Sequence, residues 1–111
     1  MPLDTLEISD AVRKGYAVLS ALDIPIIVIN GEMSVIYANP AAVTQFGAFS
    51  ERAILSGRIR SPQILDVVAQ VIGDGRTRTT EYAERVPSER WFEVRTAAVD
   101  GEGLYILSFR D

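Results

Sequence analysis

The sequence predicts an α+β domain, with a five-stranded antiparallel sheet, helices on one face and an N-terminal amphipathic helix flanking the other. The apolar run at 24–29 leads into an Asn-Gly pair, which is a strong hairpin signal. Asn-Pro at 39–40 and Ser-Pro at 61–62 each place an N-cap residue before a proline suited to the first helical turn. Residues 77–109 are rich in strand-forming residues interrupted by turns. This order of elements is typical of an α+β fold.

Length and composition indicate one globular domain. The chain has 111 residues, of which 48% are hydrophobic and 23% charged. A chain of this size buries roughly two-thirds of its unfolded surface, which is enough for a core of its own. We divide it into an N-terminal amphipathic helix, residues 1–22, and a core domain, residues 23–111.

Charge and residue usage exclude several classes of function. The net charge is -4 and the basic residues are scattered, so nucleic acid is not an expected partner. The chain has no cysteine and no histidine, which excludes disulfides, a cysteine nucleophile, a flavin-cysteinyl adduct and histidine-ligated haem. No metal site is predicted. No apolar run approaches the ~20 residues of a membrane span, so we expect a cytoplasmic protein, or the cytoplasmic portion of a membrane-anchored sensor.

The N-terminal helix carries one apolar stripe. It starts near Asp4-Thr5-Leu6-Glu7, which is close to a capping box. Such a stripe either packs back over the helix's own domain or pairs with the same helix of a second chain, and both can hold at once. The stripe residues recur every three or four positions: Ile8, Val12, Gly15, Leu19 and Leu22.

The first two strands are expected at 24–29 and 33–38. Asn30-Gly31 between them predicts a two-residue primed turn with positive φ at both positions. The first strand is apolar without alternation, so both of its faces should be covered. The N-terminal helix is the natural cover for the face turned away from the core.

Two helices are expected in the middle of the chain. The first spans 39–46, ends at Gly47 and should turn Ala42, Val43 and Phe46 inward. The second spans 62–72 and ends in the Gly-Asp-Gly turn. Between them lies an irregular segment that we expect to be anchored by Ile54, Leu55 and Ile59.

The last third should form three strands. Alternation in the middle one places Phe92 and Val94 in the core and Trp91 on the outer face, where the N-terminal helix could cover it. The expected strands are 77–86, 90–99 and 104–109, with turns at 87–89 and 100–103.

These features resemble a PAS domain. The run from 26 to 46, with its hairpin and the phrase YANPAA at 37–42, is similar to the opening of PAS domains. The helix at 62–72 and the strand ERWFEV at 89–94 resemble the PAS domain of PhoR-type sensor histidine kinases. The resemblance covers the chain from about residue 17 onward.

The resemblance implies a sensor and dimerisation module of a bacterial signal-transduction protein, a two-component sensor histidine kinase. Such a module would relay a signal by repacking its terminal helices, and Asn39 would be the fold-critical helix cap. The ending Phe109-Arg110-Asp111 resembles the close of a PAS domain, which implies a fragment cut at the junction with a kinase or other output domain in cis. We expect a homodimer whose interface includes Ile8, Val12, Gly15, Leu19, Leu22 and Trp91.

The alternative is a small-molecule sensor with an occupied apolar cavity. A filled core is favoured over a cavity, since apolar stripes at these spacings are most often core. No cofactor is expected, although a non-covalent small ligand remains open, and Arg58 and Arg60 could meet its carboxylate or phosphate. The residues expected on the inner face are Val28, Val43, Phe46, Ile54, Ile64, Leu65, Val68, Phe92 and Val94.

Catalysis within this chain is not expected. Asp66 lies between Leu65 and Val67 on a helix and is expected to be exposed. Glu93 alternates with Phe92 and Val94, so it should face away from them. A catalytic acid with a perturbed pKa would instead stand among the apolar positions. The acid-base candidates weighed are Asp23, Asp66, Glu81, Glu93, Tyr37, Tyr82 and Tyr105.

Overall fold

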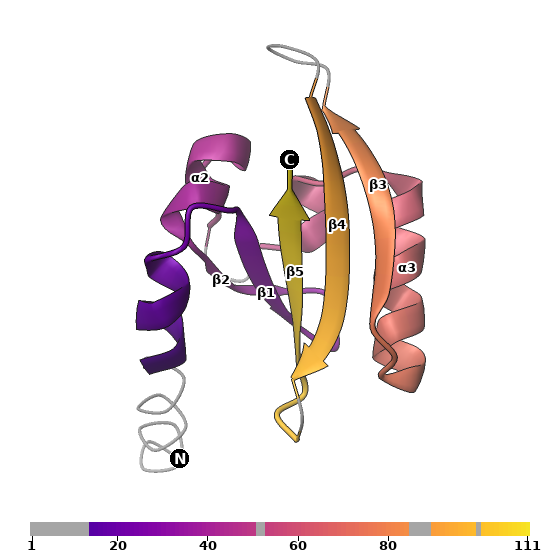
Figure 1. Cartoon of the computed structure of the whole chain (residues 1–111). Helices are drawn as coiled ribbons and strands as arrows, with labels where there is room; N and C mark the ends of the chain where they lie inside the picture. Colours follow the sequence, from indigo (N-terminus) through magenta and orange to yellow (C-terminus); the bar gives the residue numbers. More distant parts are fainter. Residues whose placement is uncertain (1–13, 51–52, 85–89, 100) are drawn as a thin grey trace.

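The computed structural model describes residues 14–50, 53–84, 90–99 and 101–111 (Figure 1). Residues 14–20 are helical, and the expected start of that helix, with Ile8 and Val12, lies outside the described residues, as does the turn at 87–89. The later elements are β1 (Ile26–Asn30), β2 (Val35–Ala38), α2 (Pro40–Phe46), η1 (Leu55–Gly57), α3 (Pro62–Asp74), β3 (Arg78–Glu84), β4 (Arg90–Val99) and β5 (Leu104–Arg110).

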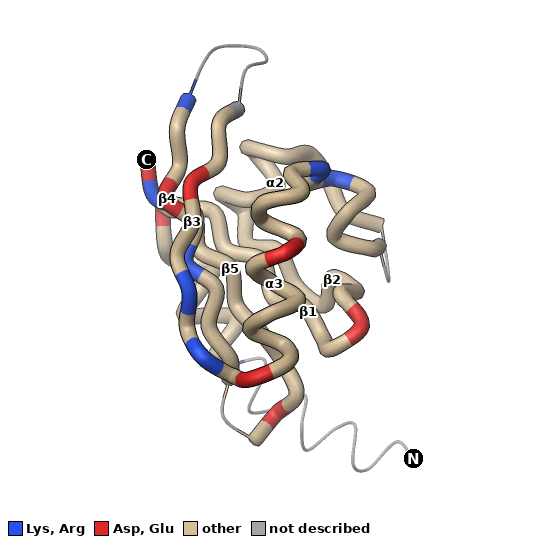
Figure 2. The backbone as a smooth tube through the Cα atoms, turned by 90° about the vertical axis from the view of Figure 1, so that its right-hand side faces the viewer, with Lys and Arg blue, Asp and Glu red and all other residues tan. Residues whose placement is uncertain are grey.

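The five strands form one antiparallel sheet in the order β2-β1-β5-β4-β3. Helices α2 and α3 pack on the same face of the sheet and both lie to the right of β3 and β4 in Figure 2, whereas the N-terminal helix lies beside β1 and β2 in Figure 1. The predicted α+β architecture is confirmed. The part of the chain that the structure describes contains no helix long and apolar enough to cross a membrane.

The core lies between the sheet and the two helices. Ala42 of α2 and Ile64 and Val68 of α3 are fully buried against inward-facing residues of all three central strands. Four aromatic rings fill one end of this layer with centroids 4.9 to 6.5 Å apart, a separation at which edge-to-face pairs are favourable. They belong to Phe46, Tyr82, Phe92 and Phe109.

The β1–β2 hairpin is present, but its predicted primed turn is wrong. Positive φ falls on Met33 (φ 62) and not on Gly31. The Met33 N–H donates to the Asn30 carbonyl at 3.1 Å, and the Asn30 side-chain oxygen accepts from the N–H groups of Glu32 and Ser34. Asn30 therefore shapes the turn through its side chain, and the left-handed residue follows the turn, as in longer hairpin loops.

The two helix starts form as predicted. The Asn39 and Ser61 side chains accept hydrogen bonds from Ala42 N and Ile64 N, at 2.9 and 3.2 Å. Helix α3 runs two residues beyond the expected end, to Asp74, and Gly75 closes it in the left-handed conformation (φ 75). That φ explains why a glycine stands there.

Candidate functional site

The inner face of the sheet holds most, not all, of the residues expected there. Ile64, Val68, Phe92 and Val94 are at most 2% exposed, while Leu65 and Phe46 are partly buried against the same cluster. Aromatic and aliphatic side chains thus occupy the space between sheet and helices. Whether any of these residues lines a ligand cavity stays a prediction.

Three of the expected inner-face residues lie elsewhere. Val43 and Ile54 are 38% and 57% exposed, so the prediction that they face the core is wrong. Ala42 and Phe46 take the inward side of the short helix α2, and Leu55, next to Ile54, is the buried anchor. Val28 is buried, but strand alternation sets it on the outer face, opposite Ile106 and Tyr37.

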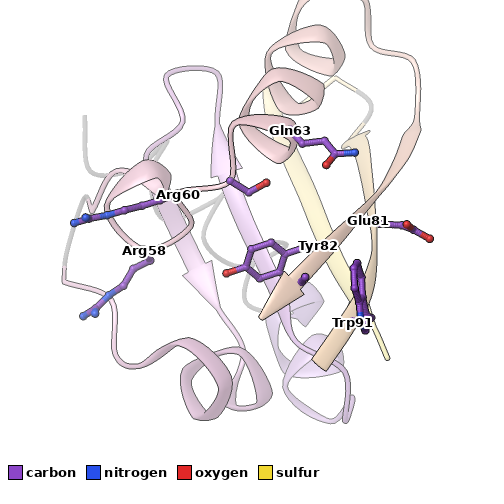
Figure 3. A pocket seen from close by; sticks show the side chains of 8 residues that line it. Arg58, Arg60, Gln63, Glu81, Tyr82 and Trp91 are labelled. Carbon is purple, nitrogen blue, oxygen red and sulfur yellow. The ribbon is translucent and has the colours of Figure 1, made fainter. Parts of the chain in front are cut away.

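A surface hollow of about 490 Å³ lies at the free edge of β3 (Figure 3). Figure 3 shows Arg58 and Arg60 on one side of Tyr82, and Glu81 and Trp91 on the other. The Arg58 guanidinium donates to the Ala48 carbonyl at 2.5 Å and lies 5.9 Å from the Phe49 ring centroid. These polar groups do not converge on a common point, so this hollow carries no ligand assignment.

Asn39 is fully buried, and its side chain makes four hydrogen bonds. Its side-chain oxygen accepts from Ile26 N and Ala42 N, both at 2.9 Å. Its amide nitrogen donates to the carbonyls of Leu19 and Ile24, at 3.1 and 2.9 Å. One side chain therefore joins the N-terminal helix, the start of β1 and the start of α2, with its hydrogen-bonding capacity satisfied.

A tyrosine pair supports the same junction. The rings of Tyr16 and Tyr37 stack with centroids 4.2 Å apart and planes 8° from parallel. The Tyr37 hydroxyl hydrogen-bonds the Ser20 hydroxyl and donates to the Tyr16 carbonyl at 3.4 Å. The buried Tyr16 hydroxyl has no hydrogen-bond partner within the described ranges. Burial, followed by the charge of Tyr37, raises the pKa of Tyr16. The N-terminal helix is thus docked on its own domain.

The expected dimer residues divide between two environments. Leu19 is half-buried toward the Asn39 junction, whereas Gly15 and Leu22 are exposed. Val18, which the sequence reasoning missed, is 65% exposed on the same helix. Trp91 is 58% exposed on the outer face of β4, which β1 and β5 separate from β2, and the described helix does not cover it.

Arg90 links the end of α2 to the last residue of the chain. Its guanidinium donates to Gln45 Oε1 at 2.6 Å, pairs with Asp111 and lies 5.0 Å from the Phe92 ring centroid. Sequence reasoning noted the strand ERWFEV without assigning these contacts, since they join positions up to 45 residues apart.

No described carboxylate has the environment of a catalytic acid. Asp23, Asp66, Glu81 and Glu93 are exposed, as are the other Asp and Glu side chains whose burial the structure describes. Tyr37, Tyr82 and Tyr105 are partly buried. In the described ranges, no group of three or more Asp or Glu residues is arranged to hold a metal ion.

Solved structures provide the comparison, because no family model and no curated protein matches this chain. The PAS domain of nitrogen regulation protein NR(II) from Vibrio parahaemolyticus is similar, with a TM-score of 0.66 and 20% identity over 87% of this chain and 96% of that one. A domain of a sensory box sensor histidine kinase/response regulator from Geobacter sulfurreducens gives 0.65 and 20%, over 93% of both chains. The photoactive yellow protein domain of the sensor histidine kinase Ppr from Rhodospirillum centenum gives 0.62 and 16%, over 86% and 92%.

Proposed function

On the premise that this chain has the PAS fold, we propose that it is a sensor and dimerisation module of a signal-transduction protein. A two-component sensor histidine kinase is the parent that we favour, with the kinase or another output domain in cis. Two of the similar structures come from proteins whose names include sensor histidine kinase, which supports this context. No catalytic role is proposed for the chain itself.

The observation that carries the proposal is the Asn39 junction. A signal that shifts the core changes the positions of Ile26 N and Ala42 N, and Asn39 bonds these groups and the Leu19 carbonyl at once. Repacking of the core would therefore move the N-terminal helix. A module that signals by repositioning its terminal helices needs such a coupling.

Dimerisation would use the face of the N-terminal helix that its own domain leaves free. Gly15 offers close approach, Val18 exposes an apolar side chain on the same helix, and Leu22 exposes another just past the helix end. Ile8 and Val12 continue the sequence pattern upstream. Tyr16 and Leu19 meanwhile face the chain's own domain, so the helix can serve both roles that its stripe suggested.

Sedimentation velocity of the V18E/L22E variant tests this proposal. We expect a folded monomer where the unsubstituted chain dimerises, because the two charges would enter an apolar contact. The V43E variant is the matched control, since it changes an exposed valine on a different helix. A folded V18E/L22E protein that dimerises as tightly as the V43E control would contradict the proposed interface.

A small-molecule sensor is the second candidate, and one atom favours it. Thr96 is fully buried on the inner face of β4, and its hydroxyl has no hydrogen-bond partner among the residues that the structure describes. A polar ligand atom could satisfy that group. Any such ligand would be held non-covalently, since the chain has no histidine for haem ligation and no cysteine for a flavin adduct. Native mass spectrometry of protein purified from cells would reveal a bound mass, and a T96V variant should lose it.

A further inference from the structure

The turn between β1 and β2 contains an asparagine followed by a glycine, Asn30 and Gly31. Figure 2 shows this turn at the periphery of the molecule, beside the labels of both strands. Gly31 is exposed and Asn30 is half-buried. An asparagine side chain can react with the backbone nitrogen of the next residue, and a glycine there leaves that nitrogen open to approach because it has no side chain. This pair is therefore a candidate for chemical modification.

The Gly31 nitrogen is available in the folded chain. Among the described residues, the Gly31 N–H makes no hydrogen bond. The backbone bonds of the turn run from Asn30 N to the Ser34 carbonyl at 3.0 Å and from Met33 N to the Asn30 carbonyl at 3.1 Å. Apart from the chain neighbours of Gly31, nothing described lies within 4 Å of the point where a side chain would begin. The nitrogen can therefore react without first giving up a hydrogen bond.

The Asn30 side-chain oxygen lies between two donors that suit a developing negative charge. It accepts hydrogen bonds from Glu32 N at 2.9 Å and from Ser34 N at 3.0 Å. When a nitrogen adds to the side-chain carbonyl carbon, the carbonyl oxygen becomes an oxyanion, and backbone N–H donors at these distances stabilise such a charge. The turn thus supplies both an unblocked nucleophile and a site for the oxyanion.

The pair Asp74-Gly75, at the end of α3, is chemically related but blocked. The Gly75 N–H donates to the Val71 carbonyl at 2.7 Å, so its nitrogen is occupied. The Arg78 guanidinium hydrogen-bonds the Asp74 carboxylate and holds the pKa of that carboxyl well below its usual range. An ionised carboxylate resists attack by a nucleophile. The features that favour reaction at Asn30 are therefore not shared by this second turn.

We propose that Asn30 is a modification site at which the chain deamidates itself, and that the folded turn promotes the reaction. The Gly31 nitrogen gives its proton to a solvent base and bonds to Asn30 Cγ. The Cγ–Nδ2 bond breaks, and the side-chain nitrogen takes a proton from solvent and leaves as ammonia. The product is a five-membered succinimide ring. Water then opens this ring at one of its two carbonyl carbons, which yields aspartate or isoaspartate at position 30.

The two products differ in their effect on the hairpin. Aspartate keeps a side-chain oxygen that can accept from Glu32 N and Ser34 N, so the turn persists with one more negative charge. Isoaspartate adds one carbon to the backbone and so displaces the segment that follows. That segment is tied to the core, because the Met33 carbonyl accepts from Leu55 N at 2.9 Å and Leu55 is fully buried. Isoaspartate formation would therefore loosen the attachment of the hairpin to the core.

Incubation of the purified, folded chain at neutral pH tests the proposal, with peptide mapping by mass spectrometry as the readout. We expect the peptide that contains Asn30 to gain the mass of an amide-to-acid conversion and to separate into aspartate and isoaspartate forms. Cleavage after Tyr37 places Asn39 in a different peptide, which is the internal control. It should stay unchanged, because the nitrogen of Pro40 carries no hydrogen.

The same chain unfolded in guanidinium chloride shows what the turn contributes. The folded chain should convert at least as fast as the unfolded chain, because the turn holds both the free nitrogen and the two donors in place. A folded chain that converts more slowly than the unfolded chain would overturn the proposal.

A matched pair of variants tests the backbone donors. E32P removes the Glu32 N–H, whereas E32A keeps that donor and removes only the acidic side chain. With both folded by circular dichroism, E32P should react at least about threefold more slowly than E32A, because one donor to the oxyanion is lost. In denaturant the two should react at equal rates. Equal rates in the folded state would contradict promotion by the turn, and the comparison of folded with unfolded chain stands even if E32P does not fold.

Discussion

At the scale of single residues, Asn39 shows both what sequence can predict and where it stops. The Asn-Pro pair predicts the N-cap, because capping depends only on neighbours within one turn. The two hydrogen bonds donated to Leu19 and Ile24 depend on how the N-terminal helix packs against the sheet. Local pattern carries no information on that packing, so the wider role of Asn39 emerges only from the structure.

Replacing Asn39 with alanine should cost about 2–4 kcal/mol of unfolding free energy, because two buried and two partly buried backbone groups would lose their partner. Urea denaturation followed by circular dichroism measures this loss. The N30A variant is the control: its two hydrogen bonds lie in the hairpin turn, and about 0.5–1 kcal/mol is expected. Equal losses for the two variants would refute a special role for Asn39.

Replacing Tyr16 with phenylalanine should leave stability unchanged or raise it by up to about 1 kcal/mol at pH 7, because the buried hydroxyl has no partner in the described part of the chain. The raised pKa of Tyr16 adds a pH effect. Above about pH 10 the unfolded chain ionises this tyrosine more readily than the folded chain, so stability falls as pH rises.

Thermal melts between pH 7 and 11 measure that fall, which should be shallower in the Y16F variant. The Y37F variant is the comparison, since it removes the hydroxyl that bonds Ser20 and the Tyr16 carbonyl. It should be less stable at pH 7. A Y16F protein that is as destabilised as Y37F would mean that the Tyr16 hydroxyl is hydrogen-bonded in solution.

At the scale of elements, strand and helix positions follow from the sequence better than the facing of side chains does. Caps and turn residues identify α2 and α3, yet α2 is only seven residues long. In so short a helix, Ala42 is the one fully buried residue, and Val43 faces outward. The inner-face prediction for Val28 is wrong because β1 is apolar on both faces, so alternation gives no sign of which face meets the core.

Replacing Gly31 with alanine tests the observed hairpin turn. Because Gly31 has no positive φ and nothing within 4 Å of an added Cβ, G31A should stabilise the protein by about 0.4–1 kcal/mol. A primed turn would predict the opposite sign. The G75A variant is the control and should destabilise by about 1 kcal/mol, since Gly75 is left-handed. Chemical denaturation of both variants measures the two effects.

At the scale of the whole molecule, a five-stranded antiparallel sheet with helices on one face follows from the order of the elements and the PAS resemblance, whereas the strand order comes only from the structure. The placement of the N-terminal helix beside β2, away from Trp91, likewise comes only from the structure. The described part of this helix is held chiefly by the Tyr16–Tyr37 stack and one Asn39 hydrogen bond. The sheet, in contrast, is held by a shared core and continuous ladders.

Hydrogen exchange should therefore separate the helix from the sheet. Amides of residues 16–20 should open with a lower free energy than those of β1 and β5, because few contacts must break. The N39A variant should lower their protection further, and the N30A variant should not. Mass spectrometry of exchanged, proteolysed protein measures both. Equal protection of helix and sheet in the unsubstituted chain would show that they unfold together.

The pairing of β1 with β5 fixes where the chain enters and leaves the core. Ile26 lies opposite Ser108, and the Phe109 N–H donates to the Pro25 carbonyl at 3.0 Å. The start of β1 and the end of β5 are therefore neighbours at one end of the sheet. A domain with this geometry can be spliced into a loop of a host protein without forcing the host's two halves apart, which makes it a portable part for building chimaeric receptors.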